Sequence, residues 1–268
     1  MRVRTARVWV ERQGESVEDL VAVEEPLEIR LVEVRGGVRV VKTVAITMRT
    51  PGDDEDLAVG FLFTEGILRR REDLASIRVV ALRGFVEVEL AGGVTVEWKN
   101  LERNFYMSSS CGVCGKASVE LVRTRLPDPP GPGMTVSGAM LGSFPQRLRA
   151  GQMAFDQTGG LHGAGLFAAD GSLVAIREDV GRHNAVDKVI ASQWRAGEEM
   201  TERVLMLSGR ASFELVQKAA MARIPMVASV GAPSSLAIEL AETAGLTLCG
   251  FVRAERWNVY CGGERITA

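Results

Sequence analysis

VLMLSGRASFELVQKAAMARIPMVASVGAPSSLAIELAETAGLTLCGF, residues 204–251, alternates short apolar runs with segments of helical character. Three of those runs are predicted to be strands: residues 204–207, 226–230 and 246–251. Residues 235–244 have helical spacing and end at Gly245, a residue favoured just past a helix C-terminus. Strands that alternate with helices are typical of an α/β layer built around a sheet. From about Ser137 onward, the chain is therefore predicted to be α/β.

The same alternation continues upstream of this stretch. Residues 174–176 form another short apolar run that predicts a strand. Residues 185–194 carry four apolar side chains at helical spacing on one face: Val186, Val189, Ile190 and Trp194. An apolar stripe of this kind predicts a helix that packs on the sheet.

The first hundred residues are predicted to be mainly strands. Residues 38–47 are rich in β-branched side chains, and residues 85–90 alternate strictly between apolar and charged. The alternation resumes over residues 94–99 after a glycine-rich turn, which predicts a hairpin. One helix is expected over residues 57–68, because the acidic turn TPGDDED at 50–56 precedes it.

A proline-rich segment separates the cysteine-containing region from most of the α/β pattern. Residues 127–133, PDPPGPG, cannot sustain a helix or an interior strand, so we expect a hinge or linker there. We divide the chain into a β-rich N-terminal part with one helix, residues 1–108, and an α/β domain, residues 109–268.

The composition is typical of a globular protein with a substantial core, since 46% of the 268 residues are hydrophobic and 25% are charged. The formal net charge of -2 provides no positive field for nucleic acid or an anionic membrane surface. The longest apolar run, residues 57–63, is far shorter than the roughly 20 residues of a bilayer-spanning helix. No secretory signal is recognisable at the N-terminus. We expect a cytoplasmic protein with no nucleic-acid or membrane partner.

Two of the four cysteines, Cys111 and Cys114, stand three positions apart in SSSCGVCGK, residues 108–116. A zinc site would need two further ligands, and the sequence offers neither a second close cysteine pair nor a His-x3-5-His motif. A thiol oxidoreductase would close the pair into a disulfide, whereas a sulfur carrier would use an activated thiolate to accept and donate sulfur. The missing ligands favour these two chemistries over zinc, and the spacing does not choose between them.

Three loops of small residues follow predicted strands: residues 178–184, 208–212 and 231–235. In open α/β sheets, ligands bind at the carboxyl ends of strands, where helix N-termini receive anions. The candidate phosphate contacts are Arg182, Arg210, Ser212, Ser234 and Ser235. The alternative is that each serine only caps the helix that follows. Three such loops in succession, two of them with arginine, favour a phosphorylated ligand.

The chain has only two histidines, His162 in TGGLHG and His183 next to Asn184. Both are expected in glycine-rich loops instead of on apolar faces. A lone histidine is more often structural than catalytic. We keep that alternative open beside a ligand-facing role for at least one of them.

Five segments, in order along the chain, resemble the formate dehydrogenase accessory sulfurtransferase family, FdhD: TPGDDEDL at 50–57, SCGVCG at 110–115, TGGLH at 158–162, EDVGRHNAVDK at 178–188 and APSSLA at 232–237. The longest of these segments, residues 178–188, has few competing explanations.

The resemblance implies a cytoplasmic sulfur carrier with a cytidine-deaminase-like three-layer core, a smaller β-rich part and usually a homodimeric assembly. Such a protein takes sulfur from a cysteine desulfurase as a cysteine persulfide and passes it to a molybdenum cofactor with two pterin guanine dinucleotides, which serves formate dehydrogenase. The family's persulfide cysteine corresponds to Cys111, with Cys114 as the second residue of the pair. Its cofactor stretch corresponds to Phe251, Val252, Arg253, Ala254, Glu255 and Arg256.

The candidate ligand site combines that stretch with the loops. We expect guanine nucleotides such as GDP to bind there, and the remaining candidate contacts are His162, Arg182, His183, Arg210 and Ser234. Two alternative functions share these loops: a non-catalytic chaperone that only holds the cofactor, and a thiol redox protein.

The cysteine pattern departs from that of zinc deaminases, which need His-x-Glu or Cys-x-Glu followed by Pro-Cys-x-x-Cys. Here Ser110 precedes the pair, and the sequence contains no His-x-Glu. We therefore expect neither deamination nor a bound metal. Cys249 and Cys261 belong to no motif and are expected to be small core or edge residues.

Overall fold

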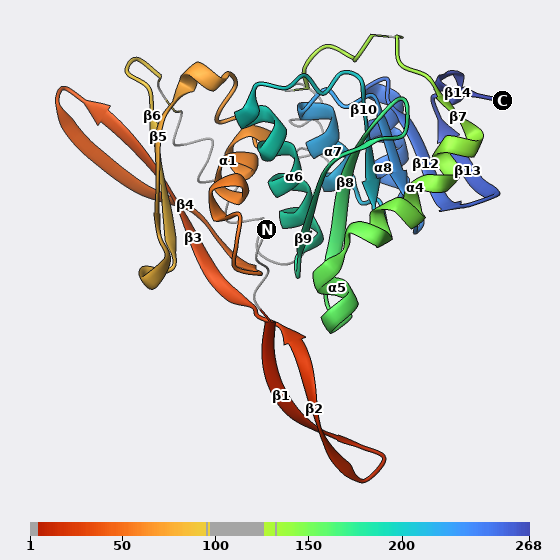
Figure 1. The fold of residues 1–268 in the computed structure, drawn as a ribbon. Coiled ribbons are helices and arrows are strands. Elements are labelled where there is room, and N and C mark those ends of the chain that lie inside the picture. Colours follow the sequence, from red (N-terminus) through yellow and green to blue (C-terminus); the bar gives the residue numbers. More distant parts are fainter. Residues whose placement is uncertain (1–4, 95, 97–125, 132) are drawn as a thin grey trace.

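The C-terminal half of the chain folds around one six-stranded mixed sheet (Figure 1). The structure is a computed structural model that describes residues 5–94, 96, 126–131 and 133–268. In spatial order, the strands are β13 (Arg256–Cys261), β12 (Thr247–Arg253), β11 (Met226–Ser229), β10 (Arg203–Leu207), β8 (His162–Ala168) and β9 (Leu173–Asp179). β10, β11 and β12 are parallel, and the other neighbouring pairs are antiparallel. The three strands predicted within residues 204–251 are thus the parallel centre of the sheet.

Helices cover both faces of this sheet. Successive side chains of a strand point to opposite faces, so each strand contributes apolar residues to two clusters. Val204 and Met206 of β10 lie in the apolar cluster that includes α4 (Gly138–Gly151), and α5 (Met153–Thr158) follows α4. Leu205 and Leu207 lie in the other cluster, which includes α6 (Arg182–Ala196), α7 (Phe213–Met221) and α8 (Ser235–Thr243). The predicted α/β class with a three-layer core is confirmed (Figure 1).

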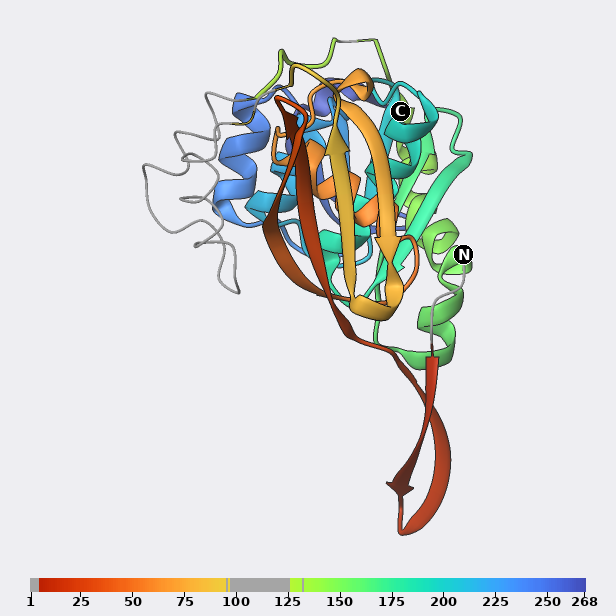
Figure 2. The same cartoon turned by 90° about the vertical axis from the view of Figure 1, so that its left-hand side faces the viewer.

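The N-terminal strands form a second sheet of four strands, which faces the viewer in Figure 2. Its order is β4 (Val38–Arg49), β3 (Glu25–Arg35), β6 (Phe85–Leu90) and β5 (Leu74–Val80). Between this sheet and α6 lies α1 (Asp54–Thr64) (Figure 1). The two helices approach closely at Gly60, where a Cβ would collide with the carbonyl group of Asp187. One apolar cluster therefore continues from β3 through α1 to α6.

Two further strand pairs lie outside these sheets. β1 (Thr5–Arg12) and β2 (Glu15–Ala22) form an antiparallel arm that projects from the body (Figure 1), and β7 (Val136–Ser137) pairs in parallel with β14 (Ile266–Thr267). Short 3₁₀ turns occupy Arg71–Asp73, Ala81–Arg83 and Gly263–Arg265. None of the helices in the described ranges is long and apolar enough to cross a membrane.

Most predicted elements are confirmed, with shifted ends. α1 ends at Thr64, four residues before the predicted end, and Leu68 is buried outside the helix. α6 begins at Arg182, three residues before the predicted start. Gly245 follows α8 with a φ of 65°, as expected for a residue just past a helix C-terminus. No helix or strand is assigned within the described part of residues 127–133.

The hairpin predicted over residues 85–99 is wrong. β6 already pairs with β3 on one side and with β5 on the other, so both of its edges are occupied. Val94 instead donates its N–H to Ala91 O in a turn, and Val96 N donates to the Glu33 carboxylate. The expected boundary between residues 108 and 109 lies outside the described residues.

Candidate functional site

The loops singled out in the sequence meet at one edge of the six-stranded sheet. β9 and β10 are both antiparallel to β8, so β9 ends at the same edge as the parallel strands β10, β11 and β12. Backbone hydrogen bonds connect neighbouring loops: Ser208 N donates to Gly163 O (3.0 Å), Gly231 N to Gly209 O (2.9 Å) and Phe251 N to Gly231 O (3.1 Å). We call this region, formed by residues 162–163, 181–183, 208–212, 231–235 and 251–256, the carboxyl edge.

Both histidines lie at the carboxyl edge, but neither is in a loop as expected. His162 is the first residue of β8 and pairs with Asp179 of β9, while His183 lies in the first turn of α6. The helix starts early because the Asp179 carboxylate binds Gly181 N and the Asn184 side chain, which closes the first turn. Arg182 and His183 thereby become helical residues.

His162 lies close to the first turn of α6 and to the loop after β10. Burial is the largest cause that lowers its pKa below 6.5, and Arg182 and His183 lower that pKa further, against a weaker opposing effect of Asp179. A Cβ placed on Gly209 would be 3.5 Å from His162 Nδ1, so glycine lets the loop backbone pass beside the imidazole ring. His162 is therefore neutral near pH 7 and able to gain a proton when an anion binds.

His183 faces Glu214 in the first turn of α7. Its Nε2 lies 3.8 Å from Glu214 Oε2, which is close for an ion pair and too long for a hydrogen bond. The His183 side chain is the main cause that lowers the pKa of Glu214 from 4.5 to about 2. In the described part of the chain, His183 Nε2 and the neighbouring Ser212 Oγ are buried atoms without a hydrogen-bond partner in range. They leave hydrogen-bonding capacity for a ligand at this edge.

The serines of the loops differ in what they bind. Ser234 Oγ accepts a hydrogen bond from Ala237 N (3.3 Å) and thereby caps α8. Helix capping was the alternative to phosphate binding for this serine. Ser235 is exposed in the first turn of α8. Ser212 stands at the N-cap of α7 without making a side-chain cap. Arg210 is exposed in the loop between β10 and α7, where it is free to reach a ligand.

The Phe251–Arg256 segment forms the end of β12 and its turn into β13. Phe251 has a φ of 54°, a left-handed conformation that is an outlier for a bulky residue, and its side chain is 41% exposed. The Val252 side chain is fully buried in the core, so it is not available to a ligand as expected. Arg253 donates to Val230 O (2.9 Å), while Ala254 and Glu255 are exposed in the turn.

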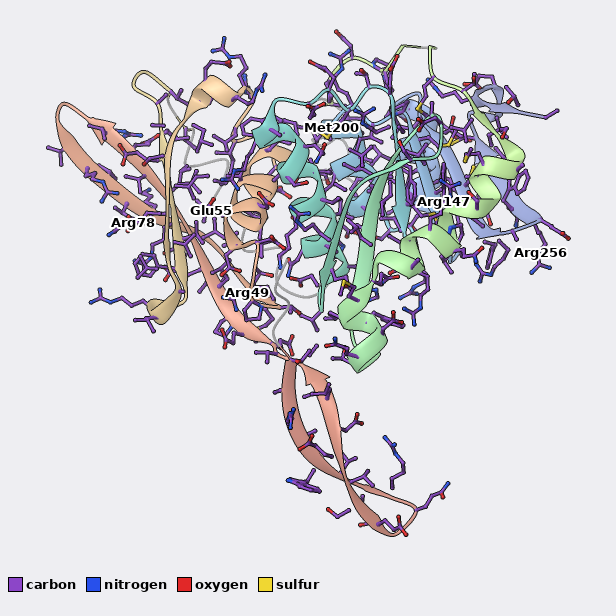
Figure 3. The ribbon with its side chains drawn as sticks, viewed as in Figure 1. Arg49, Glu55, Arg78, Arg147, Met200 and Arg256 are labelled. Carbon is purple, nitrogen blue, oxygen red and sulfur yellow. The ribbon has the colours of Figure 1, made fainter. Side chains whose placement is uncertain are left out.

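The carboxyl edge does not gather all candidate residues into one cluster. Three strand spacings separate β12 from β8, which is about 14 Å. Arg256 opens β13 at the opposite end of the sheet from β9, far from α1 and α6 (Figure 3). The candidate residues therefore line an extended edge, with His162, Arg182 and His183 near one end and Phe251 and Arg256 toward the other.

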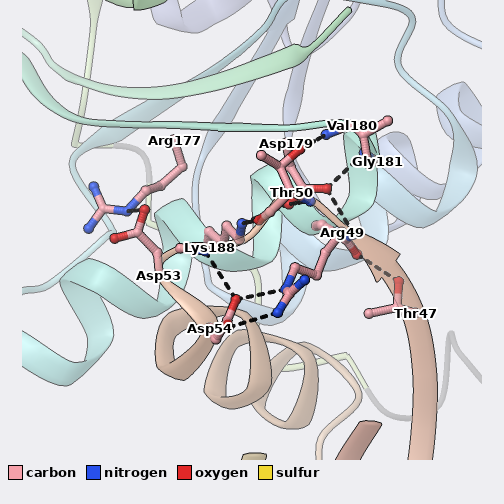
Figure 4. Close-up of polar contacts among 12 residues, drawn as sticks. Thr47, Arg49, Thr50, Asp53, Asp54, Arg177, Asp179, Val180, Gly181 and Lys188 are labelled. Atoms are coloured by element: carbon pink, nitrogen blue, oxygen red, sulfur yellow. Dashed lines mark hydrogen bonds and ion pairs between the residues drawn. The ribbon is translucent and has the colours of Figure 1, made fainter. Parts of the chain in front are cut away.

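A buried polar network below this edge was not anticipated from the sequence (Figure 4). Lys188 Nζ binds Asp179 Oδ2 (2.7 Å) and Thr50 O (2.9 Å), and all three residues are buried. Thr50 Oγ1 also accepts from Val180 N (3.1 Å). The signal in the sequence was the block 178–188 itself, because a lysine and an aspartate that become buried must find partners.

A second ion-pair network surrounds a pocket of about 340 Å³ lined by Gly52, Asp53, Asp54, Glu55, Asp56, Val79 and Arg195. Its carboxylates are paired with arginines: Asp56 binds Arg195 (2.6 Å) and Asp54 binds Arg49 (2.9 Å). Among the described residues, no group of three His, Cys, Asp or Glu side chains could hold a metal ion. The ion pairs around the pocket join α1 to β4 and to α6.

The candidate catalytic pair, Cys111 and Cys114, lies outside the described residues. Cys249 is buried in the core, and burial raises the pKa of its thiol to about 12. Cys261 is partly buried at β13, and burial raises its pKa as well. Both are poor nucleophiles, which agrees with their expected role as core or edge residues.

Fold and edge together define an α/β protein with a candidate ligand site at the carboxyl ends of a mixed sheet. The model of the FdhD/NarQ family matches residues 22–267, and the chain belongs to this family.

Relatives match the chain over nearly its full length. It is 51% identical over 259 residues to a "Sulfur carrier protein FdhD" of Streptomyces coelicolor, covering 92% of this chain and 89% of that protein. A protein of the same name from Mycolicibacterium paratuberculosis is 50% identical, with 92% of each chain covered. A crystal structure described as a formate dehydrogenase accessory protein from Desulfotalea psychrophila matches with a TM-score of 0.75 and 27% identity over 99% of both chains.

Proposed function

We propose that this protein is a sulfur carrier that serves formate dehydrogenase. It takes sulfur from a cysteine desulfurase as a persulfide on Cys111 and passes it to a molybdenum cofactor that carries two pterin guanine dinucleotides. The name of the relatives supports the sulfur-carrier role, and the Cys111–Cys114 motif in the sequence supports the site of the persulfide.

The observation that carries the proposal is the carboxyl edge. His162, Arg182 and His183 gather where α6 begins, and Arg210 stands beside them on the next loop. Helix N-termini and arginines are the groups that bind phosphate in proteins. A pterin guanine dinucleotide offers a pyrophosphate to that end of the edge. Its guanine can then reach toward Phe251, whose exposed ring provides a stacking surface.

The first sulfur transfer is a thiol exchange. The Cys111 thiolate attacks the terminal sulfur of the desulfurase persulfide, a new S–S bond forms, and the desulfurase cysteine leaves as a thiolate. The lysine at position 116 favours the attacking thiolate. Cys114 assists this cysteine or competes with it by forming a disulfide. We further propose that the protein acts in the cytoplasm as a homodimer.

Activation of formate dehydrogenase in cells that lack their own accessory protein tests this function. Cys111→Ser is expected to abolish activation, whereas Cys261→Ser, a control at a cysteine outside the motif, is expected to retain it. Full activation by Cys111→Ser would replace the sulfur carrier with a chaperone that only holds the cofactor. A reversible disulfide without any nucleotide binding would instead indicate a thiol redox protein.

A further inference from the structure

We propose that Asp179 is a positioning residue of the ligand site: with Lys188, it fixes the first turn of α6 so that Arg182 and His183 face the phosphate groups of the ligand. This inference rests on the proposed function, which supplies the ligand class.

The Asp179 carboxylate is saturated with donors. It is fully buried, and its Oδ1 accepts from Gly181 N (2.8 Å) and Asn184 Nδ2 (2.9 Å). Its Oδ2 accepts from Lys188 Nζ (2.7 Å) and Thr50 N (3.2 Å). Figure 4 shows this carboxylate between the end of β9, the start of α6 and the β4–α1 connection.

The two donors to Asp179 Oδ1 flank Arg182 and His183, two of the candidate ligand contacts. Gly181 precedes Arg182, and Asn184 follows His183, so one oxygen atom holds both ends of this dipeptide. Asn184 Nδ2 also donates to Met48 O (2.8 Å), and Val180 N donates to Thr50 Oγ1 (3.1 Å). The first turn of α6 and Val180 before it are thereby tied to the end of β4 and to the β4–α1 connection.

A buried ion pair of this kind adds little net stability, because desolvation of both charges offsets their attraction. Lys188 and Asp179 are each almost fully buried and could be replaced together by uncharged residues of similar shape. Such a replacement would remove the hydrogen bonds that orient the first turn of α6 with Arg182 and His183. The stability of the fold and the geometry of the site can therefore be separated by experiment.

The chain contains a matched control on the same helix. Asp187 is the residue before Lys188, and Lys218 of α7 binds its Oδ1 and Oδ2 at 2.9 Å each. Thr64 completes this second network, as Thr50 completes the first, by donating to Asp187 Oδ1 (2.8 Å). The Asp187 network joins α6 to α7 and α1, and it contacts none of the candidate ligand residues.

The test compares two double variants of the full chain, Asp179→Asn/Lys188→Met and Asp187→Asn/Lys218→Met. Calorimetry measures GDP affinity, thermal unfolding measures stability, and proton NMR follows the titration of His162. We expect similar shifts in melting temperature for both variants. GDP affinity should fall about tenfold or more in the Asp179 variant only, which corresponds to losing one charge-assisted contact.

The His162 titration checks that the substitution removes a charge felt at the carboxyl edge, while GDP affinity compared with melting temperature separates positioning from stability. Because Asp179 raises the pKa of His162, that pKa should fall in the Asp179 variant and stay unchanged in the control. Equal GDP affinity in the two double variants would overturn the positioning role while leaving the proposed function intact. Absence of GDP binding by the unsubstituted chain would overturn both.

A milder variant decides the question if the Asp179 double variant does not fold. Asn184→Ala removes one donor from Asp179 Oδ1 and leaves the ion pair in place. We expect it to weaken GDP binding by about threefold or more, because Gly181 N is then the remaining donor that Asp179 Oδ1 holds beside Arg182 and His183. Unchanged GDP affinity in a folded Asn184→Ala chain would contradict the positioning role.

Discussion

His183 Nε2 and Glu214 Oε2 lie 3.8 Å apart, which places the first turns of α6 and α7 side by side at the carboxyl edge. The two residues are 31 positions apart along the chain and belong to different helices. Their proximity lowers the pKa of Glu214, and its carboxylate, negative at neutral pH, is part of the field that a ligand meets.

The titration of Glu214 is the first expected outcome. Its pKa of about 2 should rise toward 4.5 in His183→Ala, because the His183 side chain is the main cause of the lowering. A carboxyl whose folded-state pKa is lowered stabilises the fold above its unfolded pKa, and that contribution is lost as pH falls from about 4.5 through about 2. Carboxyl NMR titrations of the two proteins measure it. An unchanged Glu214 pKa in His183→Ala would refute the pairing.

Ligand binding should depend on pH through His162. The pKa of this residue is lowered in the free protein, and a bound phosphate favours the imidazolium form. Binding therefore takes up a proton, and GDP affinity should increase as pH falls between about 8 and 5. His162→Gln serves as the comparison, because the titration of GDP itself contributes equally to both proteins. Identical pH dependence in the two proteins would remove His162 from the site.

Replacing Phe251 with glycine should preserve or increase the stability of the fold and weaken GDP binding. Its left-handed backbone costs about 1–2 kcal/mol that glycine does not incur, so Phe251→Gly should unfold at a similar or higher denaturant concentration. The same change should weaken GDP binding, since stacking of an aromatic side chain on a base contributes about 1–3 kcal/mol. Trp9→Ala removes another exposed aromatic ring, on the remote β1–β2 arm, and should leave GDP affinity unchanged. Retained affinity in Phe251→Gly would exclude stacking.

Packing between α1 and α6 should fail on addition of one methyl group at Gly60. A Cβ there meets the Asp187 backbone, which cannot move aside as a flexible side chain can. Gly60→Ala should lower the free energy of unfolding by about 1–3 kcal/mol in urea titrations. Gly92→Ala is the control, because nothing lies within 4 Å of a Cβ at that position. Equal stability of the two variants would show that α1 and α6 pack less closely in solution than the contact between Gly60 and Asp187 requires.

The parallel centre of the sheet was predictable because buried parallel strands are continuous apolar runs, as in residues 204–207 and 226–229. The carboxyl edge followed from these strands, since loops after parallel strands lie at one edge. The sequence alone therefore predicts that Arg182, His183 and Arg210 lie at this edge.

β8 and α4 were not predicted, for a shared physical reason. β8 (HGAGLFA) is rich in glycine because α4 and its C-cap pack directly on it: a Cβ on Gly163 would meet the side chain of Gln152, and one on Gly165 that of Leu148. α4 in turn contains Pro145 and Gly142, which weaken its helical pattern. Because this close packing requires glycines, β8 lacks the alternating apolar side chains by which a strand is recognised in a sequence.

The pairing of Asp179 with Lys188 was also beyond the sequence. The two residues are nine positions apart and belong to a strand and a helix, so no local periodicity connects them. Only the packing of α6 on β9 and on the β4–α1 connection brings them together.

The central claim, that Cys111 carries sulfur as a persulfide, is tested most directly by intact-mass spectrometry of the full chain after incubation with a cysteine desulfurase and cysteine. We predict a gain of one sulfur atom in the unsubstituted protein and in Cys261→Ser, its loss on treatment with a reducing thiol, and no gain in Cys111→Ser. A one-sulfur gain that persists in Cys111→Ser, or its absence from the unsubstituted protein, would contradict the account.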